Sequence, residues 1–130
     1  MLLEAHNLSK SYQENQEPIL RDLSLEIESG QFIAIMGPSG CGKSTLLNLL
    51  STIDRPDQGQ ILYQGQDLLA MKDKDLDRLR REAFGFVFQQ ATFLKNLNIL
   101  DNIYLPSIIG KKGSERKAAY ERAKELMALT

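Results

Sequence analysis

Residues 37 to 44 read Gly-Pro-Ser-Gly-Cys-Gly-Lys-Ser, which is the GxxxxGKS pattern of a phosphate-binding loop. Glycines let the backbone wrap until successive N–H groups point inward, and the helix that follows adds the positive end of its dipole. Lys43 would reach the β- and γ-phosphates, the Ser44 hydroxyl would ligate the Mg²⁺ that bridges them, and Thr45 offers a weaker second hydroxyl. The pattern predicts a site for a nucleoside triphosphate and Mg²⁺, formed by Gly37, Pro38, Ser39, Gly40, Cys41, Gly42, Lys43, Ser44 and Thr45.

The segments on either side of the loop provide the setting that this motif requires. Phe32 to Met36 is an apolar run that predicts a buried parallel strand, and Ser44 to Ile53 carries leucines at helical spacing. A strand, the loop and then a helix is the order in which the motif binds phosphate. The alternative is a glycine-rich turn with a solvated lysine, which these flanking segments disfavour.

Composition bounds the class of protein. The length of 130 residues fits one domain, and 16 basic against 17 acidic residues, interspersed along the chain, create no strong field for nucleic acid or an anionic membrane. No apolar run approaches the roughly 20 residues that span a bilayer, and no signal segment precedes the first strand. The single cysteine fits a reducing compartment. We therefore expect an intracellular chain without a nucleic-acid partner and without direct membrane insertion.

The remaining pattern predicts alternating strands and helices around the loop. The charged helix carries ion-pair partners four residues apart, Asp77 with Arg81 and Arg78 with Glu82, which is typical of a solvated face. The predicted elements are a strand hairpin from Leu2–Leu8 and Ile19–Ile27, a short strand over Gln60–Gln64, the charged helix over Lys72–Glu82, a buried strand over Phe84–Gln89, and helices over Leu97–Ile109 and Ser114–Leu129.

Several segments, taken in order, resemble the first half of an ATP-binding-cassette (ABC) ATPase. They are GPSGCGKST at residues 37–45, the helix from Asp67 to Arg81, GFVFQ at residues 85–89 and LNILDNIYL at residues 97–105. Within the family, RLRRE before GFVFQ and LDNIYLP after it are similar to exporters of lipoproteins, macrolides and antimicrobial peptides. Another P-loop enzyme, such as a kinase, would share the loop but not the later segments.

The resemblance implies the fold and the domain plan. The fold would be α/β, a P-loop NTPase of the ABC ATPase type with an N-terminal antiparallel β subdomain, a truncated core sheet and the start of the helical subdomain. Residues 1–130 would form a single, incomplete nucleotide-binding domain, with the antiparallel β region at 1–30, part of the P-loop core at 31–89 and the start of the helical subdomain at 90–130.

The resemblance also implies roles outside the loop. Tyr12 matches the aromatic residue that stacks on adenine, although a partly buried tyrosine at a strand end is the alternative. Gln89 matches the glutamine that connects Mg²⁺ and the attacking water to the transmembrane partner, and it would act in catalysis with Lys43. The alternatives are a polar strand cap or a shift by one residue to Gln90. Residues 91–98 resemble the surface that receives a coupling helix of the permease, although as bare sequence they are only an apolar loop.

Two residues invite a further role. Cys41 lies where a thiolate is favoured, so its modification could block nucleotide entry. The alternative, which the mechanics of the motif favour, is that its side chain points away while its backbone N–H binds phosphate. His6 is the only histidine and has no partner motif, so we interpret it as a strand residue.

The function implied is that of the ATP-binding subunit of an ABC exporter, which couples ATP binding and hydrolysis to transport. Such a subunit is cytoplasmic, pairs with a second ATP-binding subunit as a homodimer, and is peripheral on the inner face of the cell membrane through a permease. The 130 residues contain no LSGGQ-like stretch, no convincing Walker B strand and no switch histidine. We therefore expect this truncated chain alone to bind Mg·ATP without turnover. A non-catalytic nucleotide-binding module that docks on a membrane partner is the alternative.

Overall fold

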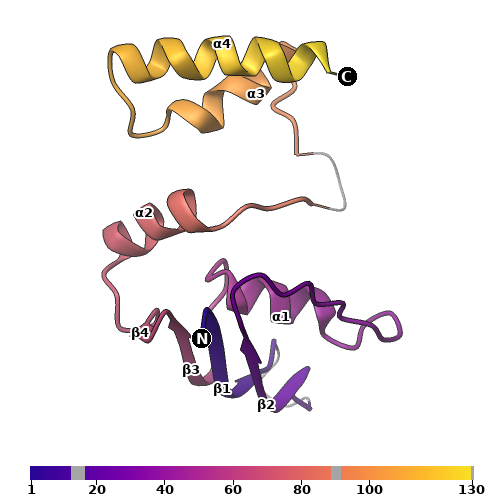
Figure 1. Ribbon diagram of the computed structural model, residues 1–130. Coiled ribbons are helices and arrows are strands. Elements are labelled where there is room, and N and C mark those ends of the chain that lie inside the picture. The colour runs from indigo at the N-terminus through magenta and orange to yellow at the C-terminus, as the bar shows by residue number, and fades with distance from the viewer. Residues whose placement is uncertain (13–16, 89–91, 130) are drawn as a thin grey trace. The chain divides into compact units, whose positions relative to one another are not determined.

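The computed structural model describes residues 1–12, 17–88 and 92–129. The chain divides into two compact units, Met1–Phe86 and Val87–Thr130 (Figure 1). The first unit holds the phosphate-binding loop and a small sheet, and the second unit is helical. None of the helices in the described residues is both long enough and apolar enough to cross a membrane.

The sheet of the first unit is antiparallel and is built around its N-terminal strand. β1 (Leu3–Lys10) pairs with β2 (Leu20–Ile27) on one side and with β3 (Gln58–Tyr63) on the other, and β4 (Gln66–Asp67) pairs antiparallel with β3. The strand order is β2-β1-β3-β4. The predicted N-terminal hairpin is confirmed, and the short strand predicted over Gln60–Gln64 is formed as β3.

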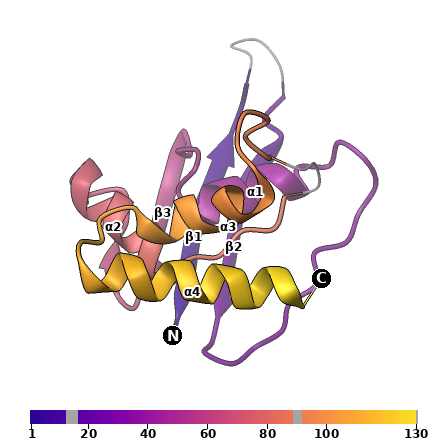
Figure 2. The same cartoon turned by 90° about the horizontal axis from the view of Figure 1, so that it is seen from above.

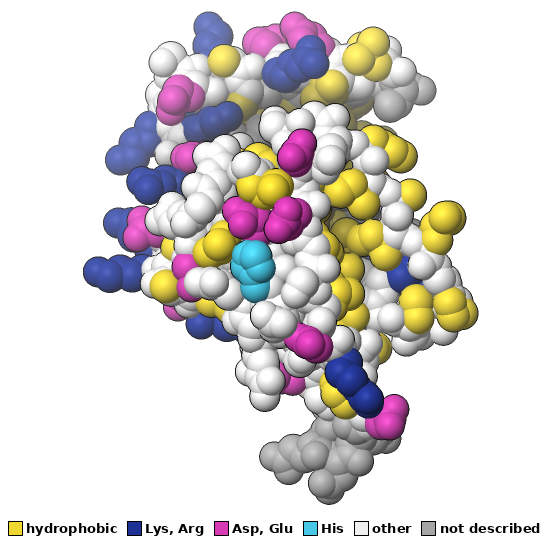
Figure 3. Space-filling view, turned by 60° about the horizontal axis from the view of Figure 1, so that its bottom comes forward, with side chains coloured by type: hydrophobic (Ala, Val, Ile, Leu, Met, Phe, Trp, Pro, Cys, Tyr) yellow, Lys and Arg dark blue, Asp and Glu magenta, His cyan; other side chains and the backbone are white. Residues whose placement is uncertain are grey.

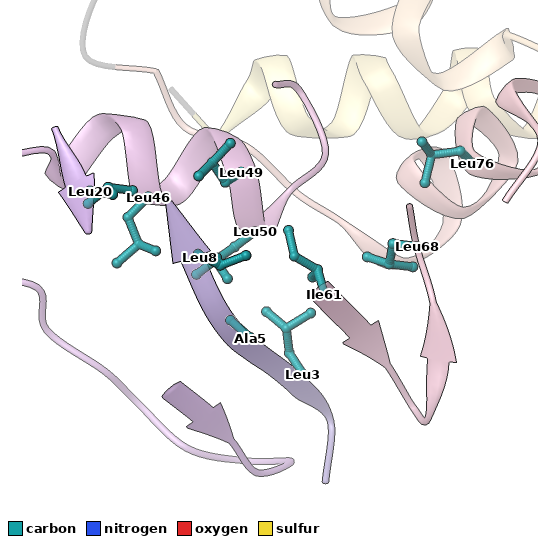
Figure 4. Close-up of a cluster of buried hydrophobic side chains, with 10 residues drawn as sticks. All are labelled: Leu3, Ala5, Leu8, Leu20, Leu46, Leu49, Leu50, Ile61, Leu68 and Leu76. Carbon is teal, nitrogen blue, oxygen red and sulfur yellow. The ribbon is translucent and has the colours of Figure 1, made fainter. Parts of the chain in front are cut away.

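A leucine-rich helix covers one face of this sheet (Figure 2). α1 (Lys43–Leu50) buries Leu46, Leu49 and Leu50, whose spacing of three and four residues places them on one side of the helix. These side chains meet inward-facing residues of the strands, as the close-up in Figure 4 shows. The buried cluster consists of Leu3, Ala5, Leu8, Leu20, Leu46, Leu49, Leu50, Ile61, Leu68 and Leu76.

The predicted charged helix is confirmed as α2 (Asp73–Ala83), but its ion pairs differ from the prediction. Arg78 pairs with Asp75 at 3.7 Å, and Arg80 pairs with Asp77, so the partners lie three residues apart. Arg80 also donates a hydrogen bond to the carbonyl of Thr52 at 2.8 Å. This second bond fixes the Arg80 guanidinium beside Asp77, which the spacing of charges in the sequence could not show.

Two predicted strands are not formed in the described residues. Neither Phe32–Met36 nor residues 84–88 belong to the sheet, and side chains expected to be buried lie at the surface, with Phe32 97% and Val87 102% exposed. A strand needs a hydrogen-bonded neighbour, and an apolar strand is buried only when both of its faces are covered. The sheet of the described residues provides neither for these segments, so the prediction of buried strands was wrong here.

The second unit consists of two helices that run in opposite directions (Figure 1 and Figure 2). α3 (Ile99–Ile108) and α4 (Ser114–Ala128) confirm the two predicted C-terminal helices. The side chain of Asn98 caps α3 by accepting a hydrogen bond from the backbone N–H of Asp101 at 2.7 Å. Tyr104 and Tyr120 join the two helices edge to face, with ring centroids 5.2 Å apart.

Candidate nucleotide-binding site

The phosphate-binding loop ends at Gly42, which has a left-handed backbone with φ of 93° at the start of α1. A Cβ at this position would lie 2.9 Å from Cδ2 of Leu20 and 3.0 Å from the carbonyl oxygen of Ile19. Both the backbone angle and the close approach require glycine. Gly42 thus attaches the loop to the start of β2 and aims the first turn of the helix.

Lys43 folds back over the loop that precedes it. Its Nζ donates hydrogen bonds to the carbonyl oxygens of Gly37 at 2.8 Å and Pro38 at 2.7 Å. The Sγ of Cys41 lies 3.7 Å from the same ammonium group. The structure therefore brings Gly37, Pro38, Cys41 and Lys43 together around one positive charge.

The loop and the first helical residues differ in how accessible they are. Residues 37–41 are exposed, Lys43 is half-buried and the side chain of Ser44 is exposed at the start of α1. No side chain caps the start of this helix, so its first N–H groups retain the capacity to bind an anion. Thr45, in contrast, is buried with 7% of its surface exposed. Of the two hydroxyls at the start of α1, that of Ser44 is the accessible one.

A Mg²⁺ ion fits this set of donors. Mg²⁺ in phosphate sites keeps several water ligands and takes one or two protein oxygens together with substrate phosphates. Ser44 offers one such oxygen next to Lys43, on the exposed side of the helix start. The loop therefore has the chemistry to hold a triphosphate with its metal ion.

Tyr12 lies just past the end of β1 with 59% of its surface exposed. Its hydroxyl donates a hydrogen bond to Oδ2 of Asp54 at 3.0 Å, and the Nζ of Lys10 lies 5.4 Å from the centre of its ring. The ring is more exposed than the alternative of a partly buried tyrosine at a strand end implies. The sequence interpretation missed Lys10 and Asp54, because they are 44 residues apart and no local pattern connects them.

Lys10 and Asp54 each stabilise the charged form of the other. Burial alone would lower the pKa of Lys10, but its hydrogen bond to Asp54 and the charges of Asp54 and Asp57 raise that pKa above its ordinary value of 10.5. Burial alone would raise the pKa of Asp54, but hydrogen bonds from the backbone of Arg55 and from Lys10 and Tyr12 bring it below 3.8. Both groups are therefore charged at neutral pH.

The remaining candidate residues belong to the segment from Gln89 to Asn98. Gln89 and Gln90 lie outside the described residues, as does residue 91. In the loop before α3, Phe93 is 71% and Leu94 49% exposed. The Asn102 side chain holds this loop by accepting from the backbone N–H of Leu94 at 2.8 Å and donating to its carbonyl at 3.1 Å.

Two further predictions from the sequence concern the side chains of Cys41 and His6. The Sγ of Cys41 lies on the lysine side of the loop, so the alternative that its side chain points away is not what the structure shows. His6 is a residue of β1, and its Nε2 lies 3.6 Å from a carboxylate oxygen of Glu4 on the same strand. Its interpretation as a strand residue is confirmed.

The glycine-rich loop, the lysine that folds back into it and the helix that follows are typical of a nucleotide-binding domain of the P-loop type. The family model described as "ABC transporter" matches residues 20–130, and the chain belongs to this family. The resemblance and the fold class predicted from the sequence are therefore confirmed.

Similar proteins include subunits of bacterial export systems. The chain is 42% identical to the lipoprotein-releasing system ATP-binding protein LolD of Bdellovibrio bacteriovorus, over 96% of this chain and 57% of that protein. It is 43% identical to the macrolide export ATP-binding/permease protein MacB of Marinobacter nauticus, over 93% of this chain and 19% of that protein. The chain thus spans little more than half the length of the first of these relatives and a fifth of the second.

A solved structure has the same fold. The ATP-binding cassette MJ0796, in a dimeric post-hydrolysis state bound to ADP and Pi, matches with a TM-score of 0.80 and 35% sequence identity. The match covers 92% of this chain and 55% of that chain. The sheet, the loop and the helices described above are therefore elements of an ABC cassette.

Proposed function

We propose that this chain provides the ATP-binding part of an ABC exporter and couples ATP binding and hydrolysis to transport through a partner permease. The observation that supports the proposal best is the arrangement of Lys43, whose ammonium lies inside a glycine-rich loop at the open start of α1. The names of the relatives LolD and MacB, both of export systems, support the direction of transport.

When ATP binds, the ammonium of Lys43 would exchange its present hydrogen-bond acceptors for phosphate oxygens. Its ammonium now donates to the carbonyls of Gly37 and Pro38, which are neutral acceptors. Phosphate oxygens carry charge and form stronger hydrogen bonds with an ammonium group, so the β- and γ-phosphates would replace these carbonyls. The N–H groups at the start of α1 would bind the same phosphates, with the helix dipole adding to the attraction.

The other site residues would contact the Mg²⁺ ion, the base and the attacking water. Ser44 would hold Mg²⁺, which when bound neutralises phosphate charge and orients the triphosphate. Tyr12 would stack on adenine with its exposed ring. Gln89 would act near the attacking water, together with Lys43, by analogy with the family motif.

The partners follow from the same relatives. MacB is by name an ATP-binding/permease protein, and the solved cassette MJ0796 is dimeric. We expect this chain to pair with a second ATP-binding subunit and to lie on the inner face of the cell membrane through a permease. The exposed Phe93 and Leu94 are the proposed contact for that permease.

The test is phosphate release from Mg·ATP by the complex purified from membranes through a tag on this chain. Phosphate release that disappears in the Lys43→Ala variant is expected. A tagged chain that stays out of the membrane fraction, and that purifies without any ATPase activity, would contradict the exporter function.

A further inference from the structure

We propose that Asp54 is a positioning residue that, with Lys10, fixes the ring of Tyr12 for stacking on the nucleotide base. The proposal rests on the proposed function, because it takes the Tyr12 ring as the base contact. It adds two residues that the phosphate-binding motif does not include.

Three donors fix the carboxylate of Asp54. Its Oδ1 accepts hydrogen bonds from Nζ of Lys10 at 3.2 Å and from the backbone N–H of Arg55 at 2.7 Å. Its Oδ2 accepts from the hydroxyl of Tyr12 at 3.0 Å. Because both oxygens have partners, the carboxylate presents Oδ2 to the tyrosine in one orientation.

Lys10 is the centre of the cluster. Its side chain is only 12% exposed, and its Nζ donates to the carbonyl of Arg55 at 2.7 Å and lies 3.5 Å from Oδ1 of Asp57. The ammonium also lies over the ring of Tyr12 at 5.4 Å from its centre. With a cation on one face of the ring, the base would stack on the opposite face.

The turn that carries Asp54 is itself held by the sheet and by α1. The backbone N–H of Asp54 donates to the carbonyl of Asn48 at 3.1 Å, and that of Asp57 donates to the carbonyl of Ser9 at 2.9 Å. The backbone N–H of Ser11 donates to Oδ2 of Asp57 at 2.6 Å. The segment before Tyr12 and the turn around Asp54 are therefore joined by several bonds.

The same strand end reaches the phosphate-binding loop. The carbonyl of Lys10 accepts a hydrogen bond from the N–H of Ile19 at 2.8 Å, and the carbonyl of Ile19 lies against Gly42. The expected base contact and the phosphate contact are thus attached to one hairpin end. A ring that is already oriented loses less conformational entropy when the base stacks on it, and this strengthens binding.

The cluster of Asp54, Lys10 and Tyr12 should affect binding of the base and not binding of the phosphates. The proposal is therefore tested by comparing a ligand that has a base with one that has none. The dissociation constants of Mg·ATP and of Mg·tripolyphosphate, which has no base, are measured for the full chain by calorimetry. Tyr12→Phe keeps the ring and removes the hydroxyl, and Asp54→Ala removes its acceptor. Asp73→Ala is the matched control, because Asp73 pairs with Arg55 at 3.1 Å but is 90% exposed and does not contact Tyr12.

We expect Y12F and D54A each to weaken Mg·ATP about three- to tenfold, which corresponds to roughly 0.7–1.4 kcal/mol, and to change tripolyphosphate less than twofold. The double variant should be no weaker than the weaker single variant, because both remove the same bond. D73A should bind both ligands as the wild-type chain does.

Three other results would contradict the base contact or the positioning role. If Tyr12→Ala leaves the affinity for Mg·ATP unchanged, the base contact of the proposed function fails, and the positioning role fails with it. If Y12A weakens Mg·ATP while Y12F and D54A do not, the base contact stands and the positioning role is overturned. An equal loss of Mg·ATP and tripolyphosphate in D54A would show a purely structural role and would also overturn it.

Discussion

The carbonyl oxygen of Ile19 lies so close to Gly42 that a Cβ at Gly42 would be 3.0 Å from it. This contact joins the residue before β2 to the residue before α1, and it places the phosphate-binding loop on the sheet. A glycine that the motif requires for binding is therefore also required for packing.

Replacing Gly42 by alanine should destabilise the first unit more than the same change at Gly40. Both residues have left-handed backbones, with φ of 93° and 81°, so each change costs about 1–2 kcal/mol in strain. A Cβ at Gly40 meets no atom within 4 Å, whereas at Gly42 it overlaps Leu20 and Ile19, which adds about 1–3 kcal/mol. Urea unfolding measures both variants, and equal midpoints would contradict the contact.

Leu49→Ala should be one of the most destabilising single changes in α1. Leu49 is fully buried in the cluster between the helix and the sheet, and a cavity of this kind costs about 2–5 kcal/mol. Leu47→Ala is the control on the same helix, because Leu47 is 55% exposed and its loss should cost roughly 0.5 kcal/mol or less. The free energy of unfolding of the two variants should differ clearly, and similar values would refute the assigned burial.

The stabilisation from Asp54 should depend on pH in the acid range. Its pKa is lowered in the folded chain, so the ionised form stabilises folding above the ordinary value of 3.8, and this is lost as pH falls through the folded pKa. The difference in unfolding free energy between wild type and Asp54→Asn should therefore be constant near neutral pH and shrink below pH 3.8. A difference that grows on acidification would have the wrong sign for this account.

Asn102→Ala should loosen the loop before α3 without unfolding the first unit. The Asn102 side chain holds the backbone of Leu94 by two hydrogen bonds and donates to the carbonyls of Leu97 and Asn98 at 3.2 and 2.9 Å. Hydrogen exchange at the Leu94 amide should accelerate about fivefold or more, as expected for the loss of roughly 1 kcal/mol. Asn96→Ala, at an exposed position of the same loop, should leave that exchange rate unchanged. Equal rates in both variants would remove Asn102 from this role.

The sequence predicted the elements whose signals are local. The partial alternation of Ile19 to Ile27 predicted β2, and the helical spacing of the leucines after the loop predicted α1. The glycine, lysine and serine positions of the loop predict a phosphate site at Lys43, which stays a prediction. Each of these depends on residues within one turn or one strand.

Other features depend on packing between distant segments. The segments at Phe32–Met36 and 84–88 look like buried strands by composition, but a strand also needs neighbours, which composition does not specify. The contacts of Asp54 with Lys10 and Tyr12 join residues more than 40 positions apart. These contacts form because the fold brings the turn after α1 against the end of β1, and no local sequence pattern specifies that packing.

The segments Phe32–Met36 and 84–88 expose large apolar side chains. Figure 3 shows hydrophobic side chains at the surface on the face drawn there, and the most exposed large ones in the first unit include Phe32 at 97% and Met36 at 88%. Apolar area of this kind favours association.

Lys43 is proposed to bind the phosphates of ATP, and the dissociation constant of Mg·ATP for the full chain measures the strength of this contact. Lys43→Ala removes the ammonium that now bonds Gly37 and Pro38, and Lys95→Ala, at an exposed position in the second unit, is the matched control. We expect at least about a tenfold weaker affinity in K43A, roughly 1.4 kcal/mol, and no change in K95A. Equal affinities for wild type, K43A and K95A would contradict it.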